Sequence, residues 1–255
     1  MFRPLAISIS LGLVLMTGCT PPSPPTSPLM TTTADGVTIY GEPYFGNVDA
    51  SAPLILLFHQ GGSNGRAEYA PLVAWLNEAG YRAIAWDQRA GGDTYGSSNR
   101  TVAMMDTTKA AGYCDAYADL EAALDYVIEQ ALAEEAIVWG SSYSGALVVQ
   151  LAAKHPDRVA GVLAFSPASG GPLVDCRARD WLEQVDAPVA VLRPASEMER
   201  TSSVEQRALL EAHGVSFHVV EHGVHGSSML VDTRTEQDMQ AARAWVLDWL
   251  AEFVR

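Results

Sequence analysis

The chain has 255 residues, of which 48% are apolar, and this is enough for one large domain with a buried core. Thirty acidic against sixteen basic side chains give a formal charge of −14, and lysine occurs only at Lys109 and Lys154. This balance, without any cluster of lysines and arginines, argues against nucleic acid and anionic lipid headgroups as partners.

The first residues have the pattern of an export signal. Arg3 is followed by an apolar stretch from Leu5 to Met16 and by small residues before Cys19. The stretch is short for a membrane span, and the letters MTGC resemble the bacterial lipobox, in which the cysteine is acylated and becomes the mature N-terminus. We therefore expect a signal peptide over 1–18 and a lipid on Cys19, with an ordinary secretory signal or an uncleaved anchor as the alternatives.

The same resemblance bears on location. The residue after the cysteine, Thr20, is not the aspartate that is associated with inner-membrane retention of bacterial lipoproteins. We expect the protein in the cell envelope, anchored through its lipid alone and favouring the outer membrane.

Proline and serine recur after Cys19 and predict an extended tether over 19–34, which leaves the domain at 35–255. Once Cys19 carries lipid, two cysteines remain, Cys114 and Cys176, in a compartment where disulfides persist. We expect these two to be bonded to each other, with two buried free thiols as the alternative.

Short apolar runs alternate with helix-length segments through the domain. Continuously apolar strands are typical of burial on both faces, and their alternation with helices predicts an α/β fold with a mostly parallel sheet between two helical layers. About twenty residues separate the predicted strands 159–166 and 188–193, which leaves no room there for a large cap domain. Strands are predicted at 37–45, 54–59, 81–87, 136–140, 159–166, 188–193 and 215–221, and helices at 67–80, 115–134, 145–156, 202–214 and 236–255.

The segment AIVWGSSYSGALVV, residues 136–149, reads as a strand, a tight turn and a buried helix. Such a turn pushes one side chain out beyond the carboxyl end of the sheet, where the amides of the helix N-terminus point. Gly140 to Gly145 resemble the nucleophile elbow of the α/β-hydrolase family, with Ser142 as the nucleophile and Ser144 where the family usually has glycine. A plain loop of small residues is the alternative.

The resemblance implies an acid and a histidine on the loops after later strands, in that order. The loop EHGVHGSSML offers His225, which a Gly-Ser pair and an apolar run follow, and His222, which we expect to make a local hydrogen bond. The loop PASEMER offers Glu197 at the family's usual position and Glu199 in reserve. Either glutamate could instead be a solvated charge.

The loop HQGGSNG after strand 54–59 resembles the family's His-Gly oxyanion stretch, with Gln60 in place of the first glycine. The resemblance implies that the amides of Gly61 and Tyr143 stabilise the oxyanion, with Gln60 as a further donor through its amide or its side chain. His59 is expected to brace this loop.

The stretch WDQRAGGDTYG resembles the family's Asp-x-Arg-Gly-x-Gly turn and implies that Asp87 and Arg89 pair beneath the site. No His-x-x-x-His, Cys-x-x-Cys or glycine-rich phosphate signature is found, so we expect neither metal nor cofactor.

Together these expectations describe an exported serine hydrolase. It would cleave a carboxylic ester or thioester of a small-molecule acyl substrate through an acyl-enzyme. The alternatives are a serine amidase or peptidase and a noncatalytic lipoprotein that uses the hydrolase fold as a binding scaffold.

Overall fold

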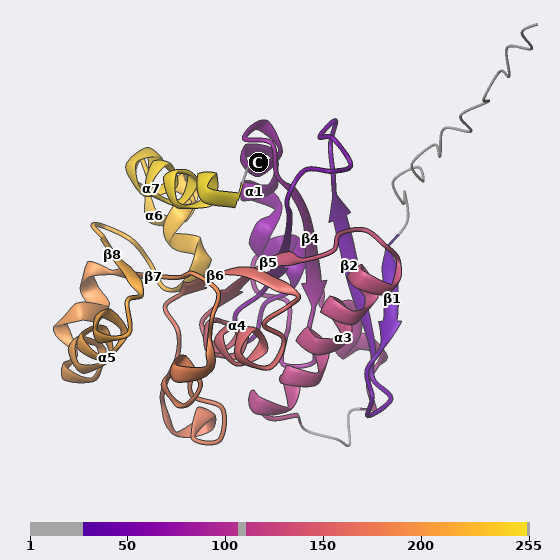
Figure 1. Ribbon diagram of the computed structural model, residues 1–255, viewed down its shortest axis with the longest axis horizontal. Coiled ribbons are helices and arrows are strands. Elements are labelled where there is room, and N and C mark those ends of the chain that lie inside the picture. Colours follow the sequence, from indigo (N-terminus) through magenta and orange to yellow (C-terminus); the bar gives the residue numbers. More distant parts are fainter. Residues whose placement is uncertain (1–27, 107–110, 254–255) are drawn as a thin grey trace, which may run out of the picture.

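The computed structural model describes residues 28–106 and 111–253. Within them an eight-stranded sheet runs in the order β1-β2-β4-β3-β5-β6-β7-β8 (Figure 1). β1 pairs antiparallel with β2, β2 pairs antiparallel with β4, and the remaining neighbours are parallel. The predicted mostly parallel sheet is confirmed. The strands are β1 (Leu29–Thr32), β2 (Thr38–Tyr44), β3 (Leu54–Phe58), β4 (Arg82–Asp87), β5 (Ala136–Ser141), β6 (Val159–Phe165), β7 (Val189–Pro194) and β8 (Ser216–Val220).

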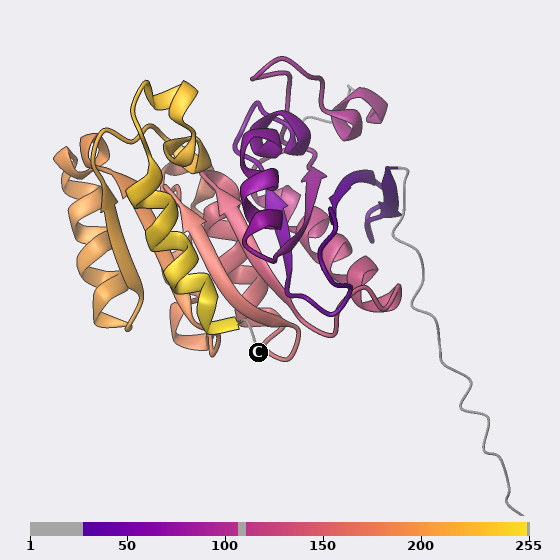
Figure 2. The ribbon, with the colours of Figure 1, turned by 90° about the horizontal axis from the view of Figure 1, so that it is seen from above.

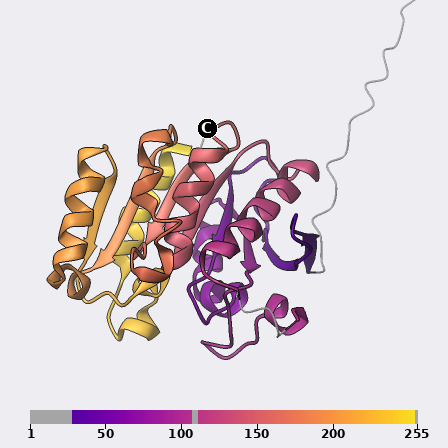
Figure 3. The same cartoon turned by 90° about the horizontal axis from the view of Figure 1, so that it is seen from below.

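Helices cover both faces of this sheet. α1 and α7 pack on one face, which Figure 2 shows with α7 in yellow, and α3, α4 and α5 pack on the other, which Figure 3 shows. Short 3-10 turns lie in the connections, among them 114–116, 171–173, 178–180, 182–184, 195–199 and 226–230. The α-helices are α1 (Gly65–Glu78), α2 (Arg100–Met104), α3 (Tyr117–Glu129), α4 (Tyr143–Lys154), α5 (Thr201–Ala212), α6 (Asp232–Thr235) and α7 (Gln240–Leu250).

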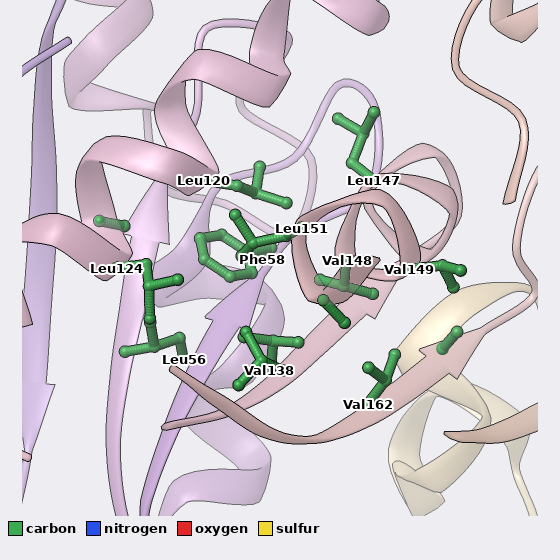
Figure 4. Close-up of a cluster of buried hydrophobic side chains, with 14 of the residues drawn as sticks. Leu56, Phe58, Leu120, Leu124, Val138, Leu147, Val148, Val149, Leu151 and Val162 are labelled. Carbon is green, nitrogen blue, oxygen red and sulfur yellow. The ribbon is translucent and has the colours of Figure 1, made fainter. Parts of the chain in front are cut away.

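Strand β3 shows why the apolar runs are continuous. Leu56 and Phe58 point into the layer under α3 and α4, where Leu120 and Leu151 meet them (Figure 4), whereas Leu57 points into the layer under α1. All five residues of β3 are buried, so each side chain of the strand contributes apolar area to one core or the other.

The domain begins earlier than the predicted tether allows. Residues 29–32, placed in the tether by their proline-rich surroundings, form the edge strand β1, in which Leu29 pairs with Gly41 and Thr32 with Thr38. Leu29 is buried and Met30 is exposed. One buried side chain and two β-branched threonines are therefore enough to form this edge strand. The proline-rich sequence around these residues led to the prediction of a tether and not of a short strand with alternating buried and exposed residues.

Two predicted helices are shorter than expected. The segment 115–134 is helical to Glu129, because Ala131 takes a left-handed conformation at φ 51° and turns the chain. In the segment 236–255, the α-helix runs only from Gln240 to Leu250, since Glu236 at φ 56° ends α6 and separates it from α7. None of the helices in 28–106 and 111–253 is long and apolar enough to cross a bilayer. The predicted signal peptide and Cys19 lie outside the described residues.

Candidate active site

Ser142 lies at the turn between β5 and α4, in a conformation that residues with a side chain seldom adopt. Its φ is 59° and its ψ −115°. The backbone is held from both sides, since Ser142 donates to the carbonyl of Phe165 over 2.8 Å and accepts from the amide of Ala168 over 3.1 Å. This strain is the signature of an elbow that projects one side chain past the carboxyl ends of the strands.

Small residues flank the turn because backbone lies against them. A Cβ on Gly140 would overlap the carbonyl oxygen of Ser144, and one on Gly145 would lie 3.2 Å from the carbonyl oxygen of Gly140. Ser144 is fully buried, and its hydroxyl donates to the carbonyl of His59 over 2.6 Å and accepts from the side-chain amide of Gln88 over 2.8 Å. The serine that replaces the family's usual glycine thus ties two neighbouring loops to the elbow.

Glu197 and His225 come from the loops after β7 and β8 and meet side chain to side chain. The Nδ1 atom of His225 lies 2.5 Å from Oε1 of Glu197, which is buried, while the imidazole is half exposed. A carboxylate accepts, so the proton sits on Nδ1 and Nε2 is left as an acceptor. Glu199, the reserve acid, is exposed and has no side-chain hydrogen bond among the described residues. His222 is also exposed, and the local hydrogen bond expected of its side chain is not found among those residues.

Arg193, which the sequence analysis did not single out, fixes the far side of this glutamate. It donates to Oε2 of Glu197, to the carbonyl of Pro167 and to the side chain of Gln206. Burial acts to raise the pKa of Glu197, but the hydrogen bond from His225 and the charge of Arg193 outweigh it, so the pKa is lowered. An arginine in a buried strand is rare unless it is paired, and this was the signal available in the sequence.

The histidine loop is docked against the elbow. The amide of Ser227 donates to the hydroxyl of Ser141, directly before Ser142, over 3.0 Å, and the amide of Gly226 donates to the hydroxyl of Ser166 over 3.1 Å. Among the described residues no hydrogen bond joins the Ser142 hydroxyl to the imidazole of His225. Such contacts are often long before substrate binds and tighten in the complex.

The loop after β3 brings amides to the same place. Both nitrogens of Gln60 are engaged. The backbone amide donates to Oε2 of Glu68 over 2.9 Å, and the side-chain amide donates to the hydroxyl of Tyr95 over 2.8 Å. The amide of Gly61 has no acceptor among the described residues, and that of Tyr143, the first residue of α4, has none within its helix. Of the three expected oxyanion donors, Gly61 and Tyr143 are therefore the free ones.

His59 braces this loop, as expected. The ring is fully buried, with Nδ1 donating to the carbonyl of Gln60 over 2.8 Å and Nε2 accepting from the amide of Gln88 over 2.9 Å. Burial lowers the pKa of His59, which keeps the ring neutral and structural.

The expected pair between Asp87 and Arg89 is wrong. Asp87, the last residue of β4, accepts from the amide of Gly65 over 2.9 Å and pairs with Arg100 over 2.8 Å. Arg89 lies two residues further along the turn, faces α3 and pairs with the buried Asp119 over 2.8 Å. Both side chains still stabilise the loops beneath the site, with other partners.

Cys114 and Cys176 are joined by the expected disulfide, with their Cα atoms 5.7 Å apart. The bond ties the segment before α3 to the segment after β6. Among the described residues, no group of three or more histidine, cysteine, aspartate or glutamate side chains is arranged to hold a metal ion.

A family model described as alpha/beta hydrolase fold matches residues 53–202, more than half of the chain. The chain belongs to the α/β-hydrolase family. The matched span includes Gly61, Ser142 and Glu197, whereas His225 lies beyond it. No curated protein matches the chain in sequence.

Solved structures of other α/β-hydrolases share the whole fold. Esterase Pf2001 of Pyrococcus furiosus superposes with a TM-score of 0.65 at 16% identity, over 90% of this chain and 91% of that one. Est1E of Butyrivibrio proteoclasticus, with ferulic acid bound, gives 0.65 at 15% identity over 88% and 99%. A putative dienelactone hydrolase of Klebsiella pneumoniae gives 0.64 at 18% identity over 89% and 99%. At identities of 15–18%, these likenesses show that the fold is shared.

Proposed function

We propose that the chain is an exported serine hydrolase that cleaves carboxylic esters or thioesters with Ser142, His225 and Glu197 as its triad. The observation that carries the proposal is the 2.5 Å hydrogen bond between His225 and the buried Glu197, on a loop docked beside the strained Ser142. A serine hydroxyl is a poor nucleophile until an imidazole takes its proton, and the imidazole needs an acid to fix its tautomer.

In the first half-reaction the hydroxyl oxygen of Ser142 attacks the acyl carbon while Nε2 of His225 takes the proton. The carbonyl oxygen becomes an oxyanion, which accepts hydrogen bonds from the amides of Gly61 and Tyr143. His225 then donates the proton to the departing alkoxide or thiolate, and the acyl group stays on Ser142. Glu197 remains ionised throughout and stabilises the imidazolium.

In the second half-reaction water replaces the leaving group. His225 takes a proton from the water, the hydroxide attacks the acyl-enzyme, and the same two amides stabilise the second oxyanion. The carboxylic acid leaves and Ser142 regains its proton. No step needs a cofactor.

The proposal includes export and anchoring. The basic start, the apolar stretch and the MTGC letters support a lipid on Cys19 that holds the domain at a membrane of the cell envelope, with the outer membrane favoured. Membrane contact is through this lipid alone, and the partner of the domain is a small-molecule acyl substrate.

The test is covalent labelling of the full-length chain with a fluorophosphonate probe, in the wild type and in Ser142→Ala and Ser141→Ala. We expect label on the wild type and on Ser141→Ala, mapped by peptide mass to Ser142, and none on Ser142→Ala. Ser141 is the matched control because its hydroxyl is buried and already accepts from Ser227. Label on another serine, or none on the folded wild type, would refute the triad.

A second candidate is a binding scaffold without catalysis, which the missing hydrogen bond between Ser142 and His225 favours. A scaffold has no reason to activate Ser142. It predicts a folded wild type that takes no probe and hydrolyses no ester or thioester, so the same experiment separates the two.

A further inference from the structure

A side chain at position 61 would meet the side chain of Tyr113. The backbone of Gly61 is not in the left-handed range, so the conformation would tolerate a side chain. However, a Cβ at Gly61 would lie 2.7 Å from the hydroxyl oxygen of Tyr113 and 3.0 Å from the nearest ring carbon. The phenol of Tyr113 therefore lies directly against the proposed oxyanion donor.

Tyr113 is held in this place from two directions. Its ring stacks on the buried ring of Tyr143, with centroids 4.8 Å apart and an angle of 20° between the planes. The next residue, Cys114, is bonded to the buried Cys176. Tyr113 nevertheless remains 37% exposed, so its side chain is not part of the buried core.

In the proposed reaction, each substituent of the acyl carbon points in a different direction. The leaving-group oxygen must face His225 to receive its proton, and the carbonyl oxygen must face the amides of Gly61 and Tyr143. The third substituent of the acyl carbon, the acyl chain, is then directed away from His225. The loop of His225 contacts Ser141, whereas Tyr113 contacts the two oxyanion residues.

We propose that Tyr113 is the end wall of the acyl pocket and limits the enzyme to short acyl groups. The inference rests on the proposed function and names its substrate class. It makes Tyr113 a specificity-determining residue, and it gives the disulfide at Cys114 the role of holding that wall in place.

The first test is the acyl-length profile. kcat/KM is measured on p-nitrophenyl acetate, butyrate and octanoate for the wild type, Tyr113→Ala and Tyr113→Phe. We expect the wild type to prefer acetate and butyrate over octanoate at least ~10-fold, and Tyr113→Ala to raise the octanoate-to-acetate ratio ~10-fold, since methylenes gain or lose about this much in an apolar pocket. Tyr113→Phe keeps the wall and should keep the wild-type profile.

Specificity on the other side of the ester is the internal control. A series of acetate esters with different alcohols varies the leaving group alone, and Tyr113→Ala should leave the preference among these alcohols unchanged. An unchanged acyl ratio in Tyr113→Ala, or an equal shift in the alcohol series, would overturn the assignment.

The second test addresses the contact itself. Gly61→Ala places a methyl group against the Tyr113 hydroxyl, so we expect lower kcat/KM and a lower melting temperature. The double variant Gly61→Ala/Tyr113→Ala should regain at least ~10-fold in kcat/KM over Gly61→Ala and recover melting temperature. A double variant no better than Gly61→Ala on both readouts would overturn the proposed contact.

The outcomes distinguish the two proposals. A wild type that is folded but takes no fluorophosphonate and cleaves no ester removes the proposed function, and the acyl-pocket assignment with it. A wild type that is labelled at Ser142 and cleaves acetate, while Tyr113→Ala keeps the wild-type acyl ratio, removes the acyl-pocket assignment alone.

Discussion

Arg193 and Glu197 lie four residues apart at the end of β7 and form an ion pair in which both side chains are less than a tenth exposed. One carboxylate oxygen of Glu197 is taken by this arginine and the other by His225. The buried guanidinium of Arg193 thus fixes the acid of the proposed triad in one orientation. Removing one partner of such a pair leaves an uncompensated buried charge.

Arg193→Met should therefore slow the enzyme and alter its pH dependence. Arg193 helps to keep the pKa of Glu197 below its ordinary value, so its loss raises that pKa, and the acidic limb of the kcat/KM profile moves to higher pH. At neutral pH we expect a loss of ~10-fold or more. The matched control is Arg207→Met, which removes an exposed pair with Glu211 and should keep the wild-type profile. An acidic limb that stays in place in Arg193→Met would contradict this role.

Glu68 is a fully buried carboxyl that the proposed reaction does not use, and burial raises its pKa. Its Oε2 accepts from the amide of Gln60, next to Gly61. Glu68→Ala leaves that amide unpaired and should lower kcat ~10-fold or more. Glu68→Gln can still accept the bond and should keep kcat/KM within about threefold of wild type. Equal losses in both variants would argue against an anchoring role.

The same residue makes a prediction for stability against pH. A carboxyl whose pKa is raised on folding contributes stability below its unfolded pKa, and that stability is lost as pH rises through the folded value. Glu68→Gln has no such loss. The free energy of unfolding of this variant should therefore increase relative to that of the wild type as pH rises above about 4.5. Urea titrations at several pH values measure this. A constant difference would mean that the pKa of Glu68 does not change on folding.

The disulfide should contribute to stability. It closes a loop with a sequence separation of 62, for which the chain-entropy account gives ~4 kcal/mol and typical measurements give about 2–4 kcal/mol. Cys114→Ser/Cys176→Ser should lower the melting temperature by roughly 10 °C. The control is Cys19→Ser, which should leave the unfolding of the domain unchanged. A melting temperature equal to that of wild type in the double variant would contradict the prediction.

Cys19→Ser should instead change location. If Cys19 carries the proposed lipid, the wild type partitions with membranes and its N-terminal peptide carries the mass of the acyl chains, whereas the variant loses both. The proposed esterase activity should be the same in the two forms. A wild type found free in the soluble fraction would contradict anchoring.

The fold class could be predicted from the sequence because buried parallel strands and amphipathic helices each have a characteristic local pattern of apolar residues. β3 and β5 are apolar at every position that contacts either core. Both strands begin and end close to their predicted limits. The edge strand β1 was missed because an edge needs little burial, and here Leu29 supplies it.

Candidate site residues could be predicted where a sequence motif specifies them. They could not be predicted where their role depends on contacts with residues distant in the sequence. Ser142 and His225 could be named from their turns, but the choice of Glu197 over Glu199 depends on which carboxylate reaches the imidazole. The partners of Arg89 could not be predicted from the turn, because Asp119 lies on a helix thirty residues away and Asp35 lies before β2. Tyr113 carries no motif, and its place depends on a stacked ring and a cross-link.

The cross-link also has a topological consequence. The chain from Cys114 to Cys176 is a covalent ring that contains α3, β5, the Ser142 turn, α4 and β6. A single cut by a protease inside this ring, for example in the exposed turn after Glu129, cannot separate the two fragments while the disulfide is intact. Ser142, the proposed nucleophile, thus lies within a closed loop that keeps both of its ends together after nicking.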